Sequence, residues 1–283
     1  MHNLAEVYPP DYTDADARRA MFEASILEPI TRSMLQRAGL SRGMRVLDLG
    51  CGAGDVSFLA AEMVGPSGTV IGVDNNPAAL AMAEDRRAKL GYRQVSFQLA
   101  ALEHLPLSAR FDAVIGRHIL MHLHAPVPVL RNVTRLVRPG GIVAFQEMAA
   151  RMPRLVYSMP TVPLWHASWQ WIADAVASTG AQLDVGGRLW HVFALADLPR
   201  PHLTCQSPIG GGIDSPFYPW VAETVRGLVQ RILSLGIATE EEIEIDTLEE
   251  RLRDGATAAD SQLVAPAQFC AWTRVPSHVR HVP

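Results

Sequence analysis

The chain has 283 residues, of which 48% are hydrophobic, and it carries a formal net charge of −4. This size suits one α/β domain with insertions, and a pI of about 6.2 argues against nucleic acid or an anionic membrane as its partner. The three cysteines are widely spaced, which predicts a protein without disulfides. There is no signal-like N-terminus and no apolar run of about 18 residues, so a cytoplasmic protein without a membrane span is expected. A monomer or homodimer is expected.

Strand-like and helical patterns alternate along the first half of the chain. Residues 1–13 are expected to form an arm, followed by a helix that begins at Asp14 and ends before Gly39. Short apolar runs predict five strands, at 45–50, 69–74, 95–100, 111–118 and 141–147. Apolar residues at helical spacing predict helices at 55–65, 77–90 and 125–137. This alternation is typical of an α/β fold with a doubly wound, mostly parallel sheet.

The second half of the chain has a different character, because every tryptophan lies beyond residue 164. The expected helices are 164–178, 187–197, 216–235 and 239–254, and two further strands at 202–207 and 264–274 bring the sheet to seven strands. The domain organisation predicted from this pattern has three parts. They are residues 1–40 as an arm and helix, residues 41–147 as a cofactor-binding half, and residues 148–283 as the rest of the sheet with a helical cap inserted.

The stretch VLDLGCGAG places Gly50, Gly52 and Gly54 directly after the first strand. Glycines there let a ligand approach the main chain where a helix begins, which suits an anionic or polar ligand. A dinucleotide loop has the spacing G-x-G-x-x-G, whereas Asp55 stands here where its third glycine would be. With Asp48 two residues ahead of it, the loop resembles the cofactor loop of class I S-adenosylmethionine-dependent methyltransferases.

Further motifs extend this resemblance over about residues 40–147. In that family an acidic residue ends the second strand and binds both ribose hydroxyls, which implies this role for Asp74. The segment AALEHLPL resembles the adenine-side motif, so the backbone N–H of Leu102 is expected at the adenine ring. Ala101 stands where the family often has Asp, with Glu103 as a candidate substitute. The resemblance implies a Rossmann-like methyltransferase fold and a cofactor site formed by Tyr12, Asp48, Gly50, Cys51, Gly52, Asp74, Asn75, Ala101, Leu102, Arg117, His118 and His122.

Two other groups of residues have alternative interpretations. His118 and His122 could be metal ligands, but zinc needs three or four ligands and no Cys or carboxylate stands at ligand spacing, so no metal is expected. Trp165 and Trp169 share a helical face and either contact the substrate or belong to the core. Glu147 and His166 are the candidate catalytic bases, if the reaction needs one.

The function that follows is transfer of a methyl group from S-adenosyl-L-methionine to a small, aromatic or heteroaromatic acceptor inside a capped pocket. A nicotinamide-dependent oxidoreductase, an RNA methyltransferase and a non-catalytic cofactor-binding protein of the same fold are the alternatives. The missing third glycine argues against the first, and the acidic charge argues against the second.

Overall fold

A computed structural model of the chain describes residues 14–105, 110–149 and 156–277. The chain divides into two compact units, each built from separate stretches of sequence. The sheet unit comprises Glu28–Glu147, Val185–Cys205 and Phe269–Pro283, and the helical unit comprises Met1–Leu27, Met148–Asp184 and Gln206–Gln268. The chain first passes from the helical unit to the sheet unit between Leu27 and Glu28, which lies inside helix α1 (Asp14–Ala38) and close to Pro29.

A seven-stranded sheet forms the centre of the sheet unit, in the order β3-β2-β1-β4-β5-β10-β7. The strands are β1 (Arg45–Leu49), β2 (Thr69–Asp74), β3 (Val95–Leu99), β4 (Phe111–Arg117), β5 (Val137–Met148), β7 (His202–Gln206) and β10 (Gln268–Arg274). The neighbouring pairs among β1 to β5 are parallel, so the carboxyl ends of these strands meet at one edge. Ligands bind above this edge in doubly wound sheets. The seven-stranded, mostly parallel fold predicted from the sequence is confirmed.

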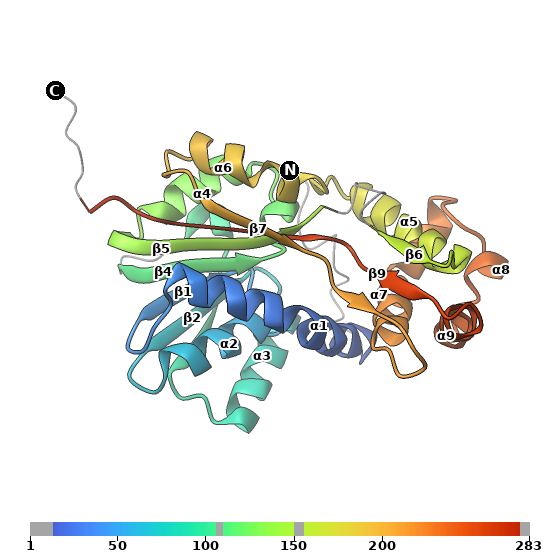
Figure 1. Cartoon of the computed structure of the whole chain (residues 1–283). Coiled ribbons are helices and arrows are strands. Elements are labelled where there is room, and N and C mark those ends of the chain that lie inside the picture. The colour runs from blue at the N-terminus through green and yellow to red at the C-terminus, as the bar shows by residue number, and fades with distance from the viewer. Residues whose placement is uncertain (1–13, 106–109, 150–155, 278–283) are drawn as a thin grey trace. The chain divides into compact units, whose positions relative to one another are not determined.

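Helices cover both faces of this sheet (Figure 1). They are α2 (Asp55–Val64), α3 (Pro77–Leu90), α4 (Pro126–Thr134) and α6 (Leu189–Leu195). Because both faces are covered, the central strands are apolar almost throughout, and Val46, Leu47 and Val70 have no exposed surface. Asn76 caps α3 by accepting the N–H groups of Ala78 and Ala79.

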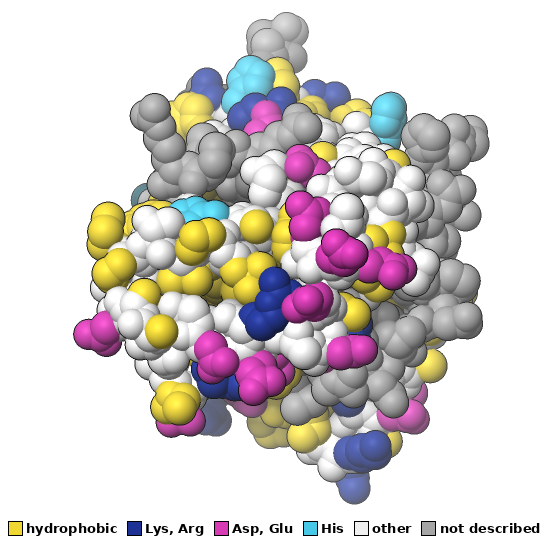
Figure 2. Space-filling model, turned by 90° about the vertical axis from the view of Figure 1, so that its right-hand side faces the viewer, with side chains coloured by type: hydrophobic (Ala, Val, Ile, Leu, Met, Phe, Trp, Pro, Cys, Tyr) yellow, Lys and Arg dark blue, Asp and Glu magenta, His cyan; other side chains and the backbone are white. Residues whose placement is uncertain are grey.

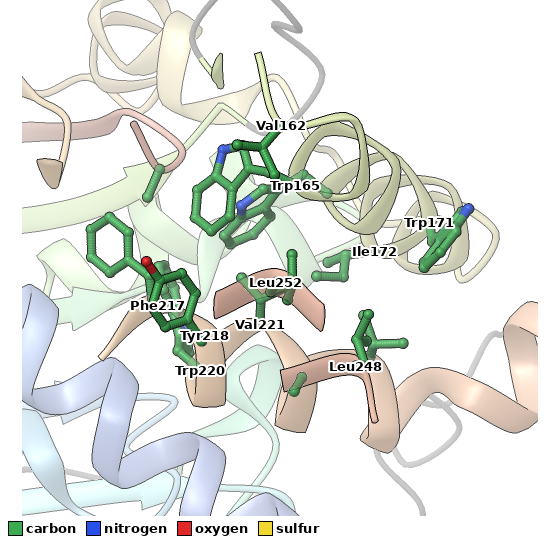
Figure 3. Close-up of a cluster of buried hydrophobic side chains, with 14 of the residues drawn as sticks. Val162, Trp165, Trp171, Ile172, Phe217, Tyr218, Trp220, Val221, Leu248 and Leu252 are labelled. Atoms are coloured by element: carbon green, nitrogen blue, oxygen red, sulfur yellow. The ribbon is translucent and has the colours of Figure 1, made fainter. Parts of the chain in front are cut away.

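The helical unit contains α5 (Pro163–Ala177), α7 (Phe217–Ser234), α8 (Glu240–Ile243) and α9 (Leu248–Ala258). A small antiparallel sheet, in the order β6-β9-β8, accompanies them and consists of β6 (Tyr157–Met159), β8 (Ile209–Gly210) and β9 (Gln262–Val264). The unit has its own core, in which the aromatic residues of α5 and α7 pack together with Val221, Leu248 and Leu252 (Figure 3).

Several elements of the second half differ from the sequence-based expectation. The prediction of one helix at 239–254 is wrong. The backbone is left-handed at Glu244 (φ 41°), which ends α8, and α9 begins four residues later at Leu248. The strand expected at 264–274 is also two strands, separated where Pro266 lacks a backbone N–H. The helix expected at 187–197 is a 3₁₀ turn (Val185–Arg188) followed by α6. No helix in the described part of the chain is long and apolar enough to span a membrane.

Candidate functional site

The glycine loop connects β1 to α2 at the carboxyl edge of the sheet. Gly50, Gly52 and Gly54 have φ values of 63°, 52° and 90°, in the left-handed region that favours glycine. A Cβ built at Gly50 would lie 2.3 Å from a side-chain atom of Ile119, so the loop packs closely there. A Cβ at Gly52 would meet nothing within 4 Å. The loop is therefore packed at one glycine and open at the next, where a ligand can reach the backbone.

Asp74 ties this loop to the end of β2. Its Oδ2 accepts the backbone N–H of Gly52 at 2.8 Å, and its Oδ1 accepts that of Asn76 at 2.9 Å. The side chain is half-buried. Each carboxylate oxygen can accept a second hydrogen bond, so the group remains suited to two vicinal hydroxyls. Cys51, whose thiol pKa is raised well above its usual value by burial, donates its backbone N–H to Val73.

Asp48 lies beneath the loop and is 1% exposed. Its Oδ2 accepts the hydroxyl of Ser57 at 2.6 Å, whereas its Oδ1 has no partner among the described residues. Burial raises the pKa of this carboxyl to about 7, although the Ser57 hydrogen bond and the charge of Arg117 oppose the shift. A buried acceptor without a partner is costly, and a donor from a ligand would satisfy it.

The expected adenine-side residues follow β3. Leu102 is buried and begins a 3₁₀ turn (Leu102–His104), whereas Ala101 precedes it and is exposed. Asn75 is half-buried and lies between Asp74 and the cap of α3. Because β1, β2 and β3 are neighbours in the sheet, their ends bring Asp48, Asp74 and Leu102 to the same edge.

The end of β4 supplies Arg117 and the strained residue His118, which has φ 52°. The backbone N–H of His118 donates to the carbonyl of Gln146 at 2.8 Å. The Nη1 of Arg117 lies 3.4 Å from Oγ1 of Thr31, whose hydroxyl donates to Oε1 of Gln146 at 2.7 Å. Thr31 and Gln146, both fully buried, therefore hold the end of β4 through side-chain and backbone contacts.

Glu147 follows Gln146 on β5 and has no exposed surface. Its Oε1 accepts the N–H groups of Ile119 and Leu120 at 3.0 and 2.8 Å, and its Oε2 accepts that of Met121 at 3.3 Å. Burial raises its pKa to about 7, while the charge of His118 and these three N–H groups oppose the shift. The carboxylate thus anchors the 3₁₀ turn Leu120–His122, which contains His122.

The remaining candidate residues belong to α5 in the helical unit. Nε2 of His166 lies 3.1 Å from the hydroxyl oxygen of Ser158, which also accepts the N–H of Val162 at 2.7 Å. Trp165 has no exposed surface and Trp169 is 7% exposed. Both pack in the core of this unit, and the indole N–H of each is without a partner among the described residues.

The candidate residues thus fall into two groups. The sheet unit brings together Asp48, Gly52, Asp74, Leu102 and Arg117 at one edge, and the helical unit holds the tryptophans and His166. Tyr12 lies outside the described residues. The motifs did not point to Ser57, Thr31, Gln146 or Ser158, because their roles come from contacts between distant segments. Among the residues that the structure describes, no group of three or more His, Cys, Asp or Glu could hold a metal ion.

Comparison with known proteins gives one family. The family model for the methyltransferase domain matches residues 40–181. Arsenite methyltransferase of Halobacterium salinarum is 39% identical over 41% of this chain and 30% of its own length. Aklanonic acid methyltransferase DauC of Streptomyces sp. strain C5 is 31% identical over 52% of this chain and 71% of its own length. The match therefore spans less than a third of the first relative and about seven-tenths of the second.

A solved structure shares the fold over nearly the whole length of this chain. A phosphoethanolamine N-methyltransferase 2 of Haemonchus contortus, solved with S-adenosylhomocysteine, superposes with a TM-score of 0.58 at 16% identity. The alignment covers 98% of this chain and 61% of that protein. At this identity the likeness concerns the fold.

Proposed function

Because the chain belongs to the methyltransferase-domain family of class I S-adenosylmethionine-dependent enzymes, we propose that it methylates a small organic acceptor. The observation that carries this proposal is the glycine loop tied to Asp74, open at Gly52 and lying above the buried carboxyl of Asp48. These residues offer complementary groups to the polar parts of S-adenosylmethionine.

The residues of the sheet unit fit this cofactor. Asp74 has the acceptor capacity for the two ribose hydroxyls, and the open space at Gly52 suits the methionyl part. The unpartnered Oδ1 of Asp48 can accept from the ammonium group, and Arg117 supplies a positive charge for the carboxylate. The backbone N–H of Leu102 is assigned to adenine.

Bound S-adenosylmethionine supplies an electrophilic methyl group on a sulfonium. The protein must then hold the acceptor in line with the S–CH₃ bond and exclude water, and alignment of this kind supplies much of the acceleration. A base is needed only when the acceptor must lose a proton. Glu147 is engaged with three backbone N–H groups and His166 with Ser158. This engagement favours catalysis by positioning.

A small-molecule acceptor agrees with the charge of the protein and with its relatives. Two relatives act, by their names, on arsenite and on aklanonic acid, which are both small molecules. One face of the molecule gathers acidic side chains (Figure 2), and α8 alone carries Glu240, Glu241 and Glu242 at its exposed surface. Such a surface does not favour the phosphate backbone of a nucleic acid. We assign acceptor binding to the aromatic residues of the helical unit.

Calorimetric titration with S-adenosylmethionine and, separately, with NAD tests the cofactor. We expect binding of the first only, and weaker binding by Asp74→Ala. Binding of NAD alone would instead support the oxidoreductase.

The acceptor is tested by incubating the protein with S-adenosylmethionine and a panel of oxygenated and nitrogen-containing aromatic compounds, with mass spectrometry as the readout. A gain of one methyl group identifies an acceptor. Cofactor binding with no methyl gain in a chemically broad panel would instead favour the alternative of a non-catalytic cofactor-binding protein.

The positioning role is tested with Glu147→Gln and His166→Ala at saturating cofactor. We expect the KM for the acceptor to change more than kcat in His166→Ala. A kcat loss of about 10²–10⁴-fold at unchanged KM in either variant would instead identify a general base.

A further inference from the structure

Glu147 supplies the acceptors for a turn whose own first residue cannot cap it. The 3₁₀ turn Leu120–His122 follows Ile119, whose apolar side chain accepts no hydrogen bond. The N–H groups of residues 119–121 instead reach the neighbouring strand β5, where the carboxylate of Glu147 accepts all three. The N–H of His118 goes to the carbonyl of Gln146, the residue before Glu147. Four consecutive N–H groups after β4 are thus held by two consecutive residues of β5.

A buried carboxylate is a costly way to hold a turn. Glu147 has no exposed surface, and taking a charged group out of water raises the free energy unless hydrogen bonds compensate. An apolar residue at this position of the strand would avoid that cost. It would, however, leave the three N–H groups of residues 119–121 without this acceptor. The carboxylate therefore serves to fix the position of the turn.

The turn carries Ile119, whose side chain fills the space that two glycines leave. A Cβ built at Gly50 would lie 2.3 Å from Cδ1 of Ile119 and 2.6 Å from its Cγ1. A Cβ built at Gly116, near the end of β4, would lie 2.8 Å from Cγ2, the other branch of the same side chain. Packing this close is possible because both positions lack a side chain. The Cδ1 methyl of Ile119 therefore rests on the main chain of the glycine loop.

Two steps of contact connect Glu147 to the open part of that loop. Glu147 fixes the backbone of Ile119, and Ile119 packs on Gly50, two residues before the open position Gly52. Gly52 is tied in turn to Asp74, which accepts its N–H at 2.8 Å. All five residues belong to the sheet unit. A shift of the turn would therefore be passed to the loop by direct packing.

We propose that Glu147 is a positioning residue for the cofactor loop, which acts through Ile119 and touches neither the cofactor nor the acceptor. This role rests on the proposed function, because it takes the loop from Gly50 to Gly54 as the cofactor site. A general base would act on the acceptor and leave the loop unchanged. A positioning residue changes the loop even when no cofactor is bound, so the two roles can be separated by experiment.

Nuclear magnetic resonance can observe the loop directly, because Cys51–Gly52 is the only Cys-Gly pair in the sequence. Cysteine carrying ¹³C at its carbonyl and glycine carrying ¹⁵N therefore select one resonance, the amide of Gly52. The variants are Glu147→Gln, in which an amide nitrogen faces the N–H groups of the turn, and Ile119→Val, which removes the methyl at Gly50 but keeps both γ carbons. We expect both variants to shift the Gly52 resonance in the cofactor-free chain.

Ile142→Val is the matched control for both variants. Ile142 is a buried residue of the same strand β5, 1% exposed, and its substitution removes the same methyl group as Ile119→Val. It pairs with Ala113 in the first part of β4, away from the turn that follows this strand. The control should lower Tm slightly and leave the Gly52 resonance in place. A purely structural role of Glu147 would give the same pattern as this control.

Calorimetric titration with S-adenosylhomocysteine measures the consequence for binding. It is done at about pH 8.5, because burial raises the pKa of Glu147 to about 7 and the carboxyl is then ionised. We expect Glu147→Gln and Ile119→Val each to bind about three- to thirtyfold more weakly than the control. The double variant should bind about as weakly as the weaker single variant, because both substitutions act on one contact, whereas independent losses would multiply.

Three results would overturn the proposal: an unmoved Gly52 resonance in Glu147→Gln, an affinity of this variant equal to that of the control, or losses that multiply in the double variant. If Glu147→Gln does not fold, Glu147→Asp takes its place, since it keeps the charge and shortens the reach of the carboxylate. Titration of the unmodified chain separates this proposal from the proposed function. Failure to bind S-adenosylhomocysteine would overturn the proposed function, whereas the Gly52 resonance of the cofactor-free variants still decides whether Glu147 positions the loop.

Discussion

Replacement of Asp74 tests how far cofactor binding depends on one carboxylate. Asp74→Ala removes the acceptors of the Gly52 and Asn76 N–H groups, at 2.8 and 2.9 Å, together with those assigned to the ribose hydroxyls. Hydrogen bonds to a charged group contribute about 1.5–3 kcal/mol each, and less where the group is partly exposed. For two hydroxyls at this half-buried residue we expect a loss of about 2–4 kcal/mol in binding. This corresponds to an affinity lower by about 30-fold to several hundred-fold.

Asp74→Asn gives an intermediate step, because the amide oxygen can replace one carboxylate oxygen but the amide nitrogen cannot accept. Calorimetric titration with S-adenosylhomocysteine measures the three affinities without turnover. The expected order is the unmodified chain, then Asn, then Ala. Asp85→Ala serves as the control, since Asp85 is exposed on α3.

Thermal unfolding of each variant shows whether the site has kept its fold. The two internal hydrogen bonds of Asp74 are expected to contribute about 1–2 kcal/mol to stability, or a few degrees in Tm for a chain of this size. A folded Asp74→Ala variant with the affinity of the control would refute the assignment of the ribose to this carboxylate.

Three further predictions concern the loop and the buried carboxyls. Gly52→Val should abolish binding of S-adenosylhomocysteine, because its side chain occupies the open space of the loop. The φ of 52° is strained for a β-branched residue, so Tm should also fall, by a few degrees for a cost of about 1–2 kcal/mol. Normal cofactor binding in calorimetry would contradict this. Glu147→Gln should lower the free energy of unfolding by about 1–3 kcal/mol, because an amide nitrogen then faces backbone N–H groups. An unchanged midpoint of unfolding in urea would argue against the role of Glu147 in anchoring the turn at residues 119–121. Burial raises the pKa of Asp48 to about 7 in the folded chain, whereas the unfolded chain releases this proton above about pH 4. Between these pH values the folded state holds one more proton than the unfolded state. The contribution of Asp48 to the free energy of unfolding therefore falls as the pH rises from about 4 to 7. Unfolding measured across this range should show a weaker decline in Asp48→Asn, and equal pH profiles would refute the shift.

The first half of the fold was predictable because its signals are local. Each buried parallel strand is a short continuous apolar run bounded by turn residues, and VLDLGCGAG marks the first strand, its loop and the following helix together. The second half depends on features without such a signal. The strands β6, β8 and β9 have two or three residues each and form only because distant segments pair. The left-handed residue at Glu244 is likewise set by its surroundings, since glutamate does not favour that conformation.

The candidate site shows the same division. The positions of Asp48, Gly52 and Asp74 follow from where strands end, and strand ends can be predicted from the sequence. Which group accepts a given hydrogen bond cannot be predicted in this way. Nothing in the sequence indicates that Glu147 receives three backbone N–H groups of residues 119–121, or that Ser158 engages His166. The sequence indicated Glu147 and His166 as candidate catalytic bases. Their contacts instead indicate that Glu147 anchors the turn at residues 119–121 and that Ser158 orients His166.

The order of the strands has a consequence for biosynthesis. In the sheet, β10 (Gln268–Arg274) lies between β5 and β7, although more than a hundred residues separate it from β5. While the chain is being made, β5 therefore lacks this neighbour until β10 has left the ribosome. An unpaired buried strand edge is a template for association with other chains. Nascent copies would be vulnerable to aggregation during that interval, so the rate at which residues 148–267 are translated bears on how much native protein a cell obtains.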